Sequence, residues 1–242
     1  MRGRNLLMAL AFLFGATLYC SALAAQGPHR GPELLNYDLL WAGVKAGTAT
    51  LGIENGTDGG SIIRSTARSE DWVSVFFPVK DLVESTLTPA GYPSHYTMKI
   101  NEGSTHKDCE YAFDRYSVRY VDNILKKDKT YDSNGPVYDP LSAFNHIRWG
   151  DIPDSGSVHV SLFDSRKFSD VEVAILGREK ITVPAGTFDT IKIQPKLQSE
   201  GIFSSRGAIY VWVTNDSRRL PVRLLTKVLV GSISAELTSF QQ

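Results

Sequence analysis

Apolar and polar residues alternate along most of the chain from residue 35 onward, a pattern typical of strands with one buried face. In the first such segment Leu35, Tyr37, Leu39 and Trp41 share one face. The alternation returns many times, and clear further examples are residues 49–53, 96–100, 109–113, 158–162, 171–175, 209–213 and 233–237. Turn-forming residues separate these segments, as in Asn55-Gly56, Asn134-Gly135-Pro136 and Pro184-Ala185-Gly186.

The segments follow one another at intervals of roughly 8 to 14 residues, which suits antiparallel hairpins and leaves little room for crossover helices. The sequence therefore predicts a mainly β fold in which about a dozen strands form one large antiparallel sheet. Because a sheet of so many twisted strands rarely stays flat, we expect it to curve into a barrel or half-barrel. We interpret residues 26–242 as a single β-rich domain, with a division near residues 150–157 as the alternative.

Two segments depart from the alternation. Residues 139–150 predict a short helix packed on or inside the sheet, because Asp139 can cap its first turn and Pro140 suits the first helical position. Gly150 is expected to end that helix in a left-handed conformation. Pro140, Ala143, Phe144 and Ile147 form one apolar stripe along it. Residues 69–78 follow neither period, so a short helix or a covering loop ending at Pro78 is expected there.

The first 25 residues have the pattern of a cleaved secretory signal peptide. Arg2 and Arg4 precede an apolar run over residues 6–19, and Ala22-Leu23-Ala24 offers small residues at a cleavage site. The run has about 14 residues, whereas a spanning helix needs roughly 20, so an uncleaved anchor is only the alternative. Tyr19 before Cys20 argues against lipid attachment at this cysteine. We therefore expect an exported protein that is not integral to the membrane after cleavage.

Composition narrows the function classes further. The chain of 242 residues has 26 basic and 26 acidic side chains, so it lacks the positive charge that nucleic-acid binding needs. Cys109 is the only cysteine left after cleavage at residue 25, which excludes an internal disulfide, and its alternating surroundings predict a small buried side chain. No Gly-x-Ser-x-Gly, His-x-x-x-His or Cys-x-x-Cys motif occurs, so we expect no enzyme, no metal site and no cofactor. A Ser–His pair assembled by the fold is the alternative left open.

Several strands are apolar on both faces, as residues 34–41, 208–213 and 222–230 show. A half-exposed antiparallel sheet should instead alternate. Either the sheet closes over its helix and side chains fill the interior, or part of the interior is an apolar cavity for a lipid or acyl chain. The aromatic residues expected near such a cavity are Trp41, Trp72, Phe76, Phe77, Phe144, Trp149, Tyr210 and Trp212. Arg148 or Arg223 is expected to meet a charged headgroup.

Four motifs in order resemble the DUF3108 family of bacterial envelope proteins. They are Tyr37-Asp38-Leu39-Leu40-Trp41-Ala42-Gly43-Val44-Lys45-Ala46-Gly47, Asp139-Pro140-Leu141-Ser142-Ala143, Val183-Pro184-Ala185-Gly186-Thr187-Phe188-Asp189-Thr190, and Trp212 with Leu220-Pro221-Val222-Arg223. The resemblance implies a location in the envelope of a Gram-negative bacterium, hence in the periplasm. It also implies a β-rich fold similar to the open barrels of lipoprotein carriers. It implies no activity.

The sequence thus predicts a non-enzymatic periplasmic protein that binds or carries a lipophilic ligand in an apolar cavity. The alternative is a structural or assembly factor that binds polysaccharide or a partner protein of the envelope. The ligand, the partner and the oligomeric state are left open.

Overall fold

The computed structural model describes residues 31–196, 208–227 and 231–242, so the predicted signal peptide and Cys20 lie outside the described residues. Within them, fourteen strands form one antiparallel sheet, which confirms the predicted fold class. The strands are β1 Glu33–Trp41, β2 Val44–Asn55, β3 Ser61–Ser69, β4 Lys80–Leu87, β5 Pro93–Glu102, β6 Thr105–Asp114, β7 Ser117–Asp122, β8 Lys127–Asp132, β9 Gly156–Asp164, β10 Lys167–Val183, β11 Gly186–Lys196, β12 Ile209–Thr214, β13 Pro221–Lys227 and β14 Ser232–Gln241.

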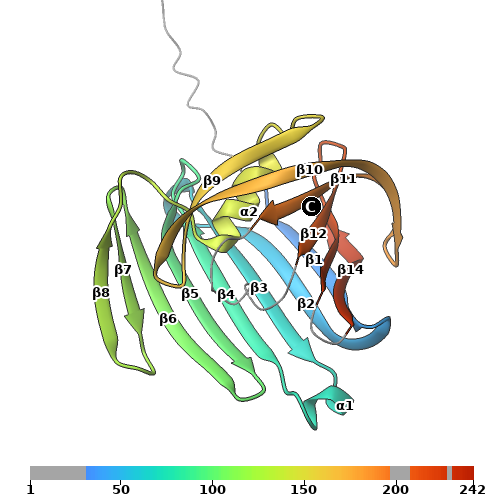
Figure 1. Cartoon of the computed structure of the whole chain (residues 1–242), viewed down its shortest axis with the longest axis horizontal. Helices are drawn as coiled ribbons and strands as arrows, with labels where there is room; N and C mark the ends of the chain where they lie inside the picture. Colours follow the sequence, from blue (N-terminus) through green and yellow to red (C-terminus); the bar gives the residue numbers. More distant parts are fainter. Residues whose placement is uncertain (1–30, 197–207, 228–230) are drawn as a thin grey trace, which may run out of the picture.

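The sheet curves into a half-barrel that stays open. Its strand order is β8-β7-β6-β5-β4-β3-β2-β1-β14-β13-β12-β11-β10-β9, so β8 and β9 are its edges. Figure 1 shows β9 and β10 arching over the concave side, where the helix α2 (Pro140–Trp149) lies. Tyr138 runs beside the edge of β9, because its N–H donates to Ser161 O at 2.9 Å and its carbonyl accepts from Phe163 N at 2.8 Å. This bridge protects part of an edge that would otherwise offer free backbone groups.

The predicted helix is confirmed, and its first turn is held by a reciprocal cap. Asp139 accepts hydrogen bonds from the N–H groups of Leu141 and Ser142, while Ser142 Oγ accepts from Asp139 N. Ser85 Oγ on β4 donates to Asp139 Oδ2 at 2.6 Å and fastens this cap to the sheet. The predicted left-handed end is wrong, because Gly150 is extended, with φ −74° and ψ −179°. A Cβ at this position would lie 3.1 Å from His146 O, so close approach rather than positive φ favours glycine.

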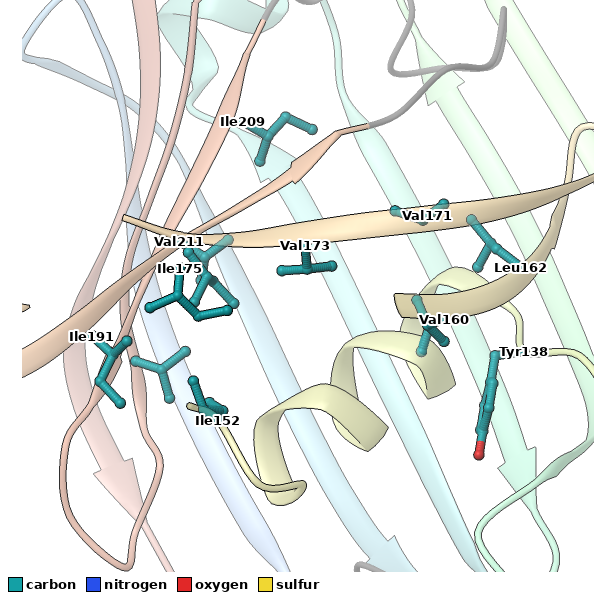
Figure 2. Packing of buried hydrophobic residues seen from close by; sticks show 13 residues of the cluster. Tyr138, Ile152, Val160, Leu162, Val171, Val173, Ile175, Ile191, Ile209 and Val211 are labelled. Atoms are coloured by element: carbon teal, nitrogen blue, oxygen red, sulfur yellow. The ribbon is translucent and has the colours of Figure 1, made fainter. Parts of the chain in front are cut away.

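Much of the interior beside α2 is filled. Valine and isoleucine side chains of β9 to β12 pack against this helix in one buried cluster (Figure 2), and its members include Val173, Ile175, Ile191, Ile193, Val211 and Val213. Ala143 is buried in this cluster, and Phe144 and Ile147 are partly buried against it. The apolar stripe of the helix therefore meets the sheet as predicted, and on this side of the half-barrel side chains occupy the space.

Replacing Phe144 by alanine should lower the free energy of unfolding by about 2 kcal/mol, less than a fully buried phenylalanine costs, because Phe144 is only partly buried. Urea denaturation followed by tryptophan fluorescence measures this change. Tyr116→Ala, at a 57% exposed position between β6 and β7, is the control and should cost less. An unchanged midpoint for Phe144→Ala would mean that α2 does not pack on the sheet in solution.

The other irregular segment contains the four-residue helix α1 (Asp71–Ser74), which confirms the short-helix alternative. A 3₁₀ turn, η1 (Thr57–Gly59), lies between β2 and β3. Because the strands are antiparallel, the connections after β1, β3, β5, β7 and β9 all lie at one end of the half-barrel, which we call the α1 end. The connections after β2, β4, β6 and β8 lie at the opposite end, the α2 end, where α2 begins.

Candidate functional site

A pocket of about 300 Å³ opens at the α1 end, between β5 to β7 and the turn that joins β9 to β10. Its volume is at the lower limit of small-molecule sites, which span roughly 300–1,000 Å³. Its floor consists of buried side chains that point to the concave face: Met98, Cys109, Tyr111 and Tyr120. Its mouth is lined by His106, Lys107, Asp122, Ile124, Leu125, Ser165 and Arg166.

Asp122 shapes the mouth of the pocket. Its carboxylate accepts from the N–H groups of Ile124 at 3.0 Å and Leu125 at 2.7 Å, and from Tyr120 Oη at 2.9 Å. Burial opposes ionisation of this carboxyl, but these three donors outweigh it and hold the pKa of Asp122 below its usual value. The ionised carboxylate thus fixes a turn that presents Ile124 and Leu125 to solvent, 50% and 61% exposed.

Two cationic side chains flank this mouth, Lys107 from β6 and Arg166 from the β9–β10 turn. The turn is strained, because both of its central residues have positive φ without being glycine: 49° at Ser165 and 66° at Arg166. Such two-residue hairpin turns strongly favour Asn-Gly or Gly-Gly, so the strain marks a position worth testing for function. The turn places Arg166 at the mouth of the pocket.

Cys109 contributes to the floor as an apolar group. Its side chain is buried, and its Sγ lies 3.5 Å from Tyr120 Oη. Burial raises the pKa of the Cys109 thiol, and it also raises the pKa values of the Tyr111 and Tyr120 hydroxyls. These groups are therefore uncharged near neutral pH, so the thiol lacks the thiolate form that a nucleophile needs. The prediction of a small buried cysteine is confirmed.

Four of the sequence-predicted site residues lie at the same end of the molecule but outside the pocket. Trp41 ends β1, and Trp72, Phe76 and Phe77 belong to the connection between β3 and β4 that contains α1. Together with Val44 and Val75 they form an exposed surface that we call the apolar rim: Trp41, Val44, Trp72, Val75, Phe76 and Phe77. The rings of Trp72 and Phe76 are 5.9 Å apart.

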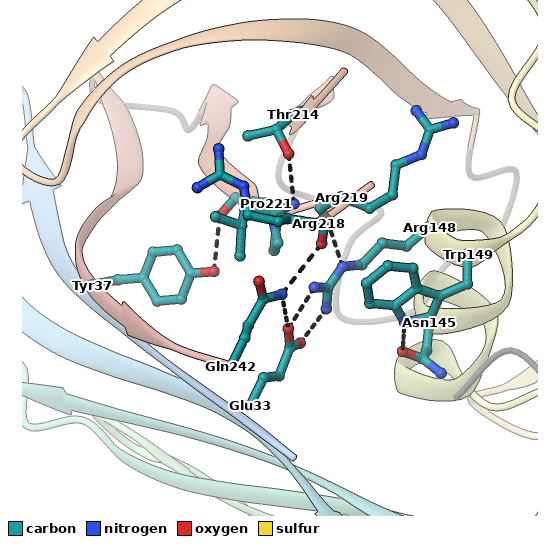
Figure 3. A network of polar contacts seen from close by, with 11 residues as sticks. Glu33, Tyr37, Asn145, Arg148, Trp149, Thr214, Arg218, Arg219, Pro221 and Gln242 are labelled. Carbon is teal, nitrogen blue, oxygen red and sulfur yellow. Dashed lines mark hydrogen bonds and ion pairs between the residues drawn. The ribbon is translucent and has the colours of Figure 1, made fainter. Parts of the chain in front are cut away.

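Three other predicted residues belong to α2, and the structure gives Arg148 a different role from the one expected. Its guanidinium is buried and pairs with the carboxylate of Glu33, so it does not face a headgroup (Figure 3). Trp149 lies against it, with the ring centroid 4.6 Å from Arg148 Cζ. Phe144 packs in the cluster beside α2. The expectation for Arg148 failed because its partner is 115 residues away in the sequence.

Tyr210, Trp212 and Arg223 lie on the face of the sheet opposite to Val211, which points to α2. Trp212 Nε1 donates to Glu179 Oε1 at 2.7 Å, and this bond with nearby Lys192 lowers the pKa of Glu179. Arg223 pairs with Glu236 at 3.0 Å. Trp212 is buried in a hydrophobic cluster that also contains Val222 and Leu237. None of the three predicted residues Tyr210, Trp212 and Arg223 lines the pocket.

None of the residues that line the pocket was predicted from the sequence as a ligand-binding residue. The alternation in residues 96–100 and 109–113 does place Met98, Cys109 and Tyr111 on one face. The sequence could therefore have predicted this part of the floor. The adjacent pair Ile124-Leu125 in a turn was a second signal, since turns favour polar residues. Ser165 and Arg166 reach the pocket only because the whole sheet curves, and no local sequence pattern predicts this curvature.

No group of three or more His, Cys, Asp or Glu side chains in residues 31–196, 208–227 and 231–242 is arranged to hold a metal ion. Neither helix in these ranges has the length and apolar character that crossing a bilayer requires.

The curved open sheet with a helix on its concave side places the chain among β-barrel-like folds. The chain belongs to the family described as "Protein of unknown function (DUF3108)", whose profile matches residues 36–238. This confirms the resemblance found in the sequence motifs. A search of curated proteins gave no match.

Three solved structures are similar to this chain at low sequence identity, and the first of them shares the fold. A β-barrel-like protein of the DUF1849 domain from Brucella abortus is similar with a TM-score of 0.57 and 10% identity, over 87% of this chain and 97% of that one. A candidate lipoprotein from Parabacteroides distasonis has a TM-score of 0.40 and 13% identity, over 89% and 97% of the two chains. A candidate exported protein with a YmcC-like fold from Bacteroides fragilis has a TM-score of 0.38 and 8% identity, over 89% and 98%.

Proposed function

We propose that this protein binds an anionic amphiphile with one acyl chain, such as a fatty acid, in the pocket at the α1 end. The observation that supports this proposal most strongly is that the pocket combines an apolar floor with cations at its mouth. Met98, Cys109 and Tyr111 offer apolar surface to a chain, while Lys107 and Arg166 can pair with a carboxylate or phosphate. Burying apolar surface contributes about 25 cal/mol per Å², so even part of an acyl chain supplies useful affinity.

The function proposed is binding or carriage rather than catalysis, in an envelope protein exported through the N-terminal signal pattern of residues 1–25. The chemistry of the pocket supports this view. Its thiol and the hydroxyls of Tyr111 and Tyr120 are held neutral by burial. The carboxylate of Asp122 is engaged by backbone N–H groups and a tyrosine. These groups shape the site instead of offering a reactive base or nucleophile.

Leu125→Asp tests the proposal without touching the core, because Leu125 is 61% exposed at the mouth. A carboxylate there should repel an anionic headgroup and weaken binding of a fluorescent fatty acid by at least about tenfold, equivalent to 1.4 kcal/mol. Titration of the purified protein with the probe measures the dissociation constant. Lys107→Gln together with Arg166→Gln should weaken binding by a similar factor and reduce its dependence on salt.

Leu176→Asp is the matched control, since Leu176 is an exposed leucine of β10 that does not line the pocket. It should bind the probe as the wild type does. The proposal is wrong if the wild type fails to bind fatty acids, or if Leu125→Asp and Leu176→Asp bind equally well. Native mass spectrometry of protein purified from cells would show directly whether it carries such a ligand.

A further inference from the structure

The apolar rim exposes more hydrophobic surface than its position in the fold requires. Exposed fractions are 86% for Val75, 60% for Phe76, 48% for Phe77 and 47% for Trp72. Three of these residues are consecutive, at the tip of a connection that projects beyond β3 and β4 in Figure 1. Large contiguous apolar patches on soluble surfaces mark sites of interaction.

Contacts below the rim hold these side chains outward. Trp72 Nε1 donates to Lys45 O at 3.2 Å, which ties α1 to β2. Phe77 lies over Gly103 so closely that a Cβ there would be 2.8 Å from its Cε2. Gly103 N also donates to Pro78 O at 2.8 Å. The exposure is therefore built into the fold by neighbouring turns.

Charge is distributed unequally between the two ends, although the chain is neutral as a whole. The five described connections of the α1 end, counted with three strand residues on either side, carry nine Lys and Arg side chains against five solvent-accessible carboxylates, those of Glu70, Asp71, Asp81, Glu102 and Asp128. The nine cations are Lys45, Arg68, Lys80, Lys107, Lys126, Lys127, Lys129, Arg166 and Lys167. Counted in the same way, the described connections after β2, β4, β6, β8, β10 and β12 at the α2 end have the reverse balance, with five solvent-accessible arginines against seven exposed carboxylates. The apolar rim thus lies at the more positive of the two ends.

From these two observations we propose that the α1 end docks onto the surface of an anionic phospholipid bilayer. Trp72, Phe76 and Phe77 enter the interface, where aromatic side chains are favoured. The cations of the α1 end, such as Lys126 and Lys127, face the headgroups and are attracted to an anionic surface. A projecting tip of consecutive apolar residues suits a fluid interface, whereas a protein partner requires a broad complementary surface.

This orientation would place the pocket mouth toward the lipid, since Ile124, Leu125 and Arg166 belong to turns of the same end. Docking itself does not depend on the pocket being occupied. The two proposals therefore fail separately: filling the pocket with Met98→Trp should abolish fatty-acid binding and leave bilayer binding intact.

Flotation with vesicles tests the docking. The protein is purified as cells process it, its N-terminus is determined by mass spectrometry, and all variants share that N-terminus. The wild type should float with vesicles of equal parts phosphatidylcholine and phosphatidylglycerol, and much less with phosphatidylcholine alone. Trp72→Ser, Phe76→Ser and Phe77→Ser combined should weaken binding by at least about tenfold, as burial of three aromatic groups is lost. Lys80→Gln, Lys126→Gln and Lys127→Gln combined should weaken binding mainly at low salt.

Tyr116→Ser with Leu176→Ser is the control, because both residues are exposed and lie outside the apolar rim. This variant should float like the wild type. Equal flotation of the rim variant and the wild type would overturn the proposal, as would no wild-type binding to anionic vesicles. A dimer in sedimentation that the rim substitutions dissociate, with no vesicle binding, would instead assign the rim to a second copy of the chain.

Discussion

Replacing Arg148 by methionine is expected to lower the free energy of unfolding by about 3–5 kcal/mol, the cost of leaving a buried charge without its partner. The side chains of Arg148 and Glu33 are each only 1% exposed. Methionine keeps the apolar stem of the arginine but removes the guanidinium. Glu33 would then have to take up a proton or admit water, and either response destabilises the folded state.

The effect should be large because this ion pair joins parts of the chain that are far apart in sequence. The guanidinium contacts both oxygens of Glu33 at the start of β1, with Nη2 at 2.7 Å from Oε2. Its Nε donates to Arg219 O at 2.6 Å, just before β13. Gln242, the last residue, donates to Glu33 Oε2 at 3.1 Å. Figure 3 shows how α2, β1 and the C-terminal residue meet here.

A double-variant cycle separates the pair from its surroundings. Glu33→Leu alone should also destabilise strongly, because it leaves the guanidinium of Arg148 buried with fewer acceptors. Glu33→Leu combined with Arg148→Met should cost less than the sum of the two single changes, since no unpaired charge remains. Equilibrium denaturation in urea gives all three values. A loss below about 1 kcal/mol for Arg148→Met would match a solvent-exposed pair and contradict the buried geometry.

Local patterns predicted the elements well, because each depends on residues close in sequence. Alternation located the strands, and Asp139 followed by Pro140 predicted the start of α2 where it is found. The apolar stripe of Ala143, Phe144 and Ile147 identified the face of the helix that meets the sheet. These features follow from periods of 2 and 3.6 residues and from capping chemistry, which a sequence displays directly.

The candidate site depends on contacts between residues that are far apart in the sequence, and local patterns do not predict such contacts. Arg166 lines the same pocket as Met98 only because the curvature of the sheet brings the β9–β10 turn to the strands β5 to β7. Bulges also change which face a residue occupies, and the shift between Ile175 and Gly177 of β10 is an example. The pairing of Arg148 with Glu33 is equally non-local, so an arginine on an apolar helix appeared available to a ligand. Alternation therefore predicts which residues share a strand face but not which distant faces meet.

Replacing Asp139 by alanine is expected to lower the free energy of unfolding by about 3 kcal/mol, through loss of a helix cap and of a buried acceptor. Asp139 Oδ1 accepts from Leu141 N at 2.8 Å and Ser142 N at 3.0 Å. Its Oδ2 accepts from Ser85 Oγ at 2.6 Å and Ser142 Oγ at 2.7 Å. Alanine removes all four acceptor contacts at a fully buried position, so Ser85 on β4 loses its acceptor.

Asp139→Asn is the informative companion, because asparagine caps helices about as well as aspartate. Its carbonyl can still accept from the two backbone N–H groups, and its amide can donate to the serine hydroxyls. Asn at this position should therefore restore more than half of the stability lost with alanine. Ser85→Ala removes only the contact to β4 and should cost about 1 kcal/mol. Urea denaturation ranks the variants, and equal stability of Asp139→Ala and the wild type would mean that neither the cap nor the contact to β4 forms in solution.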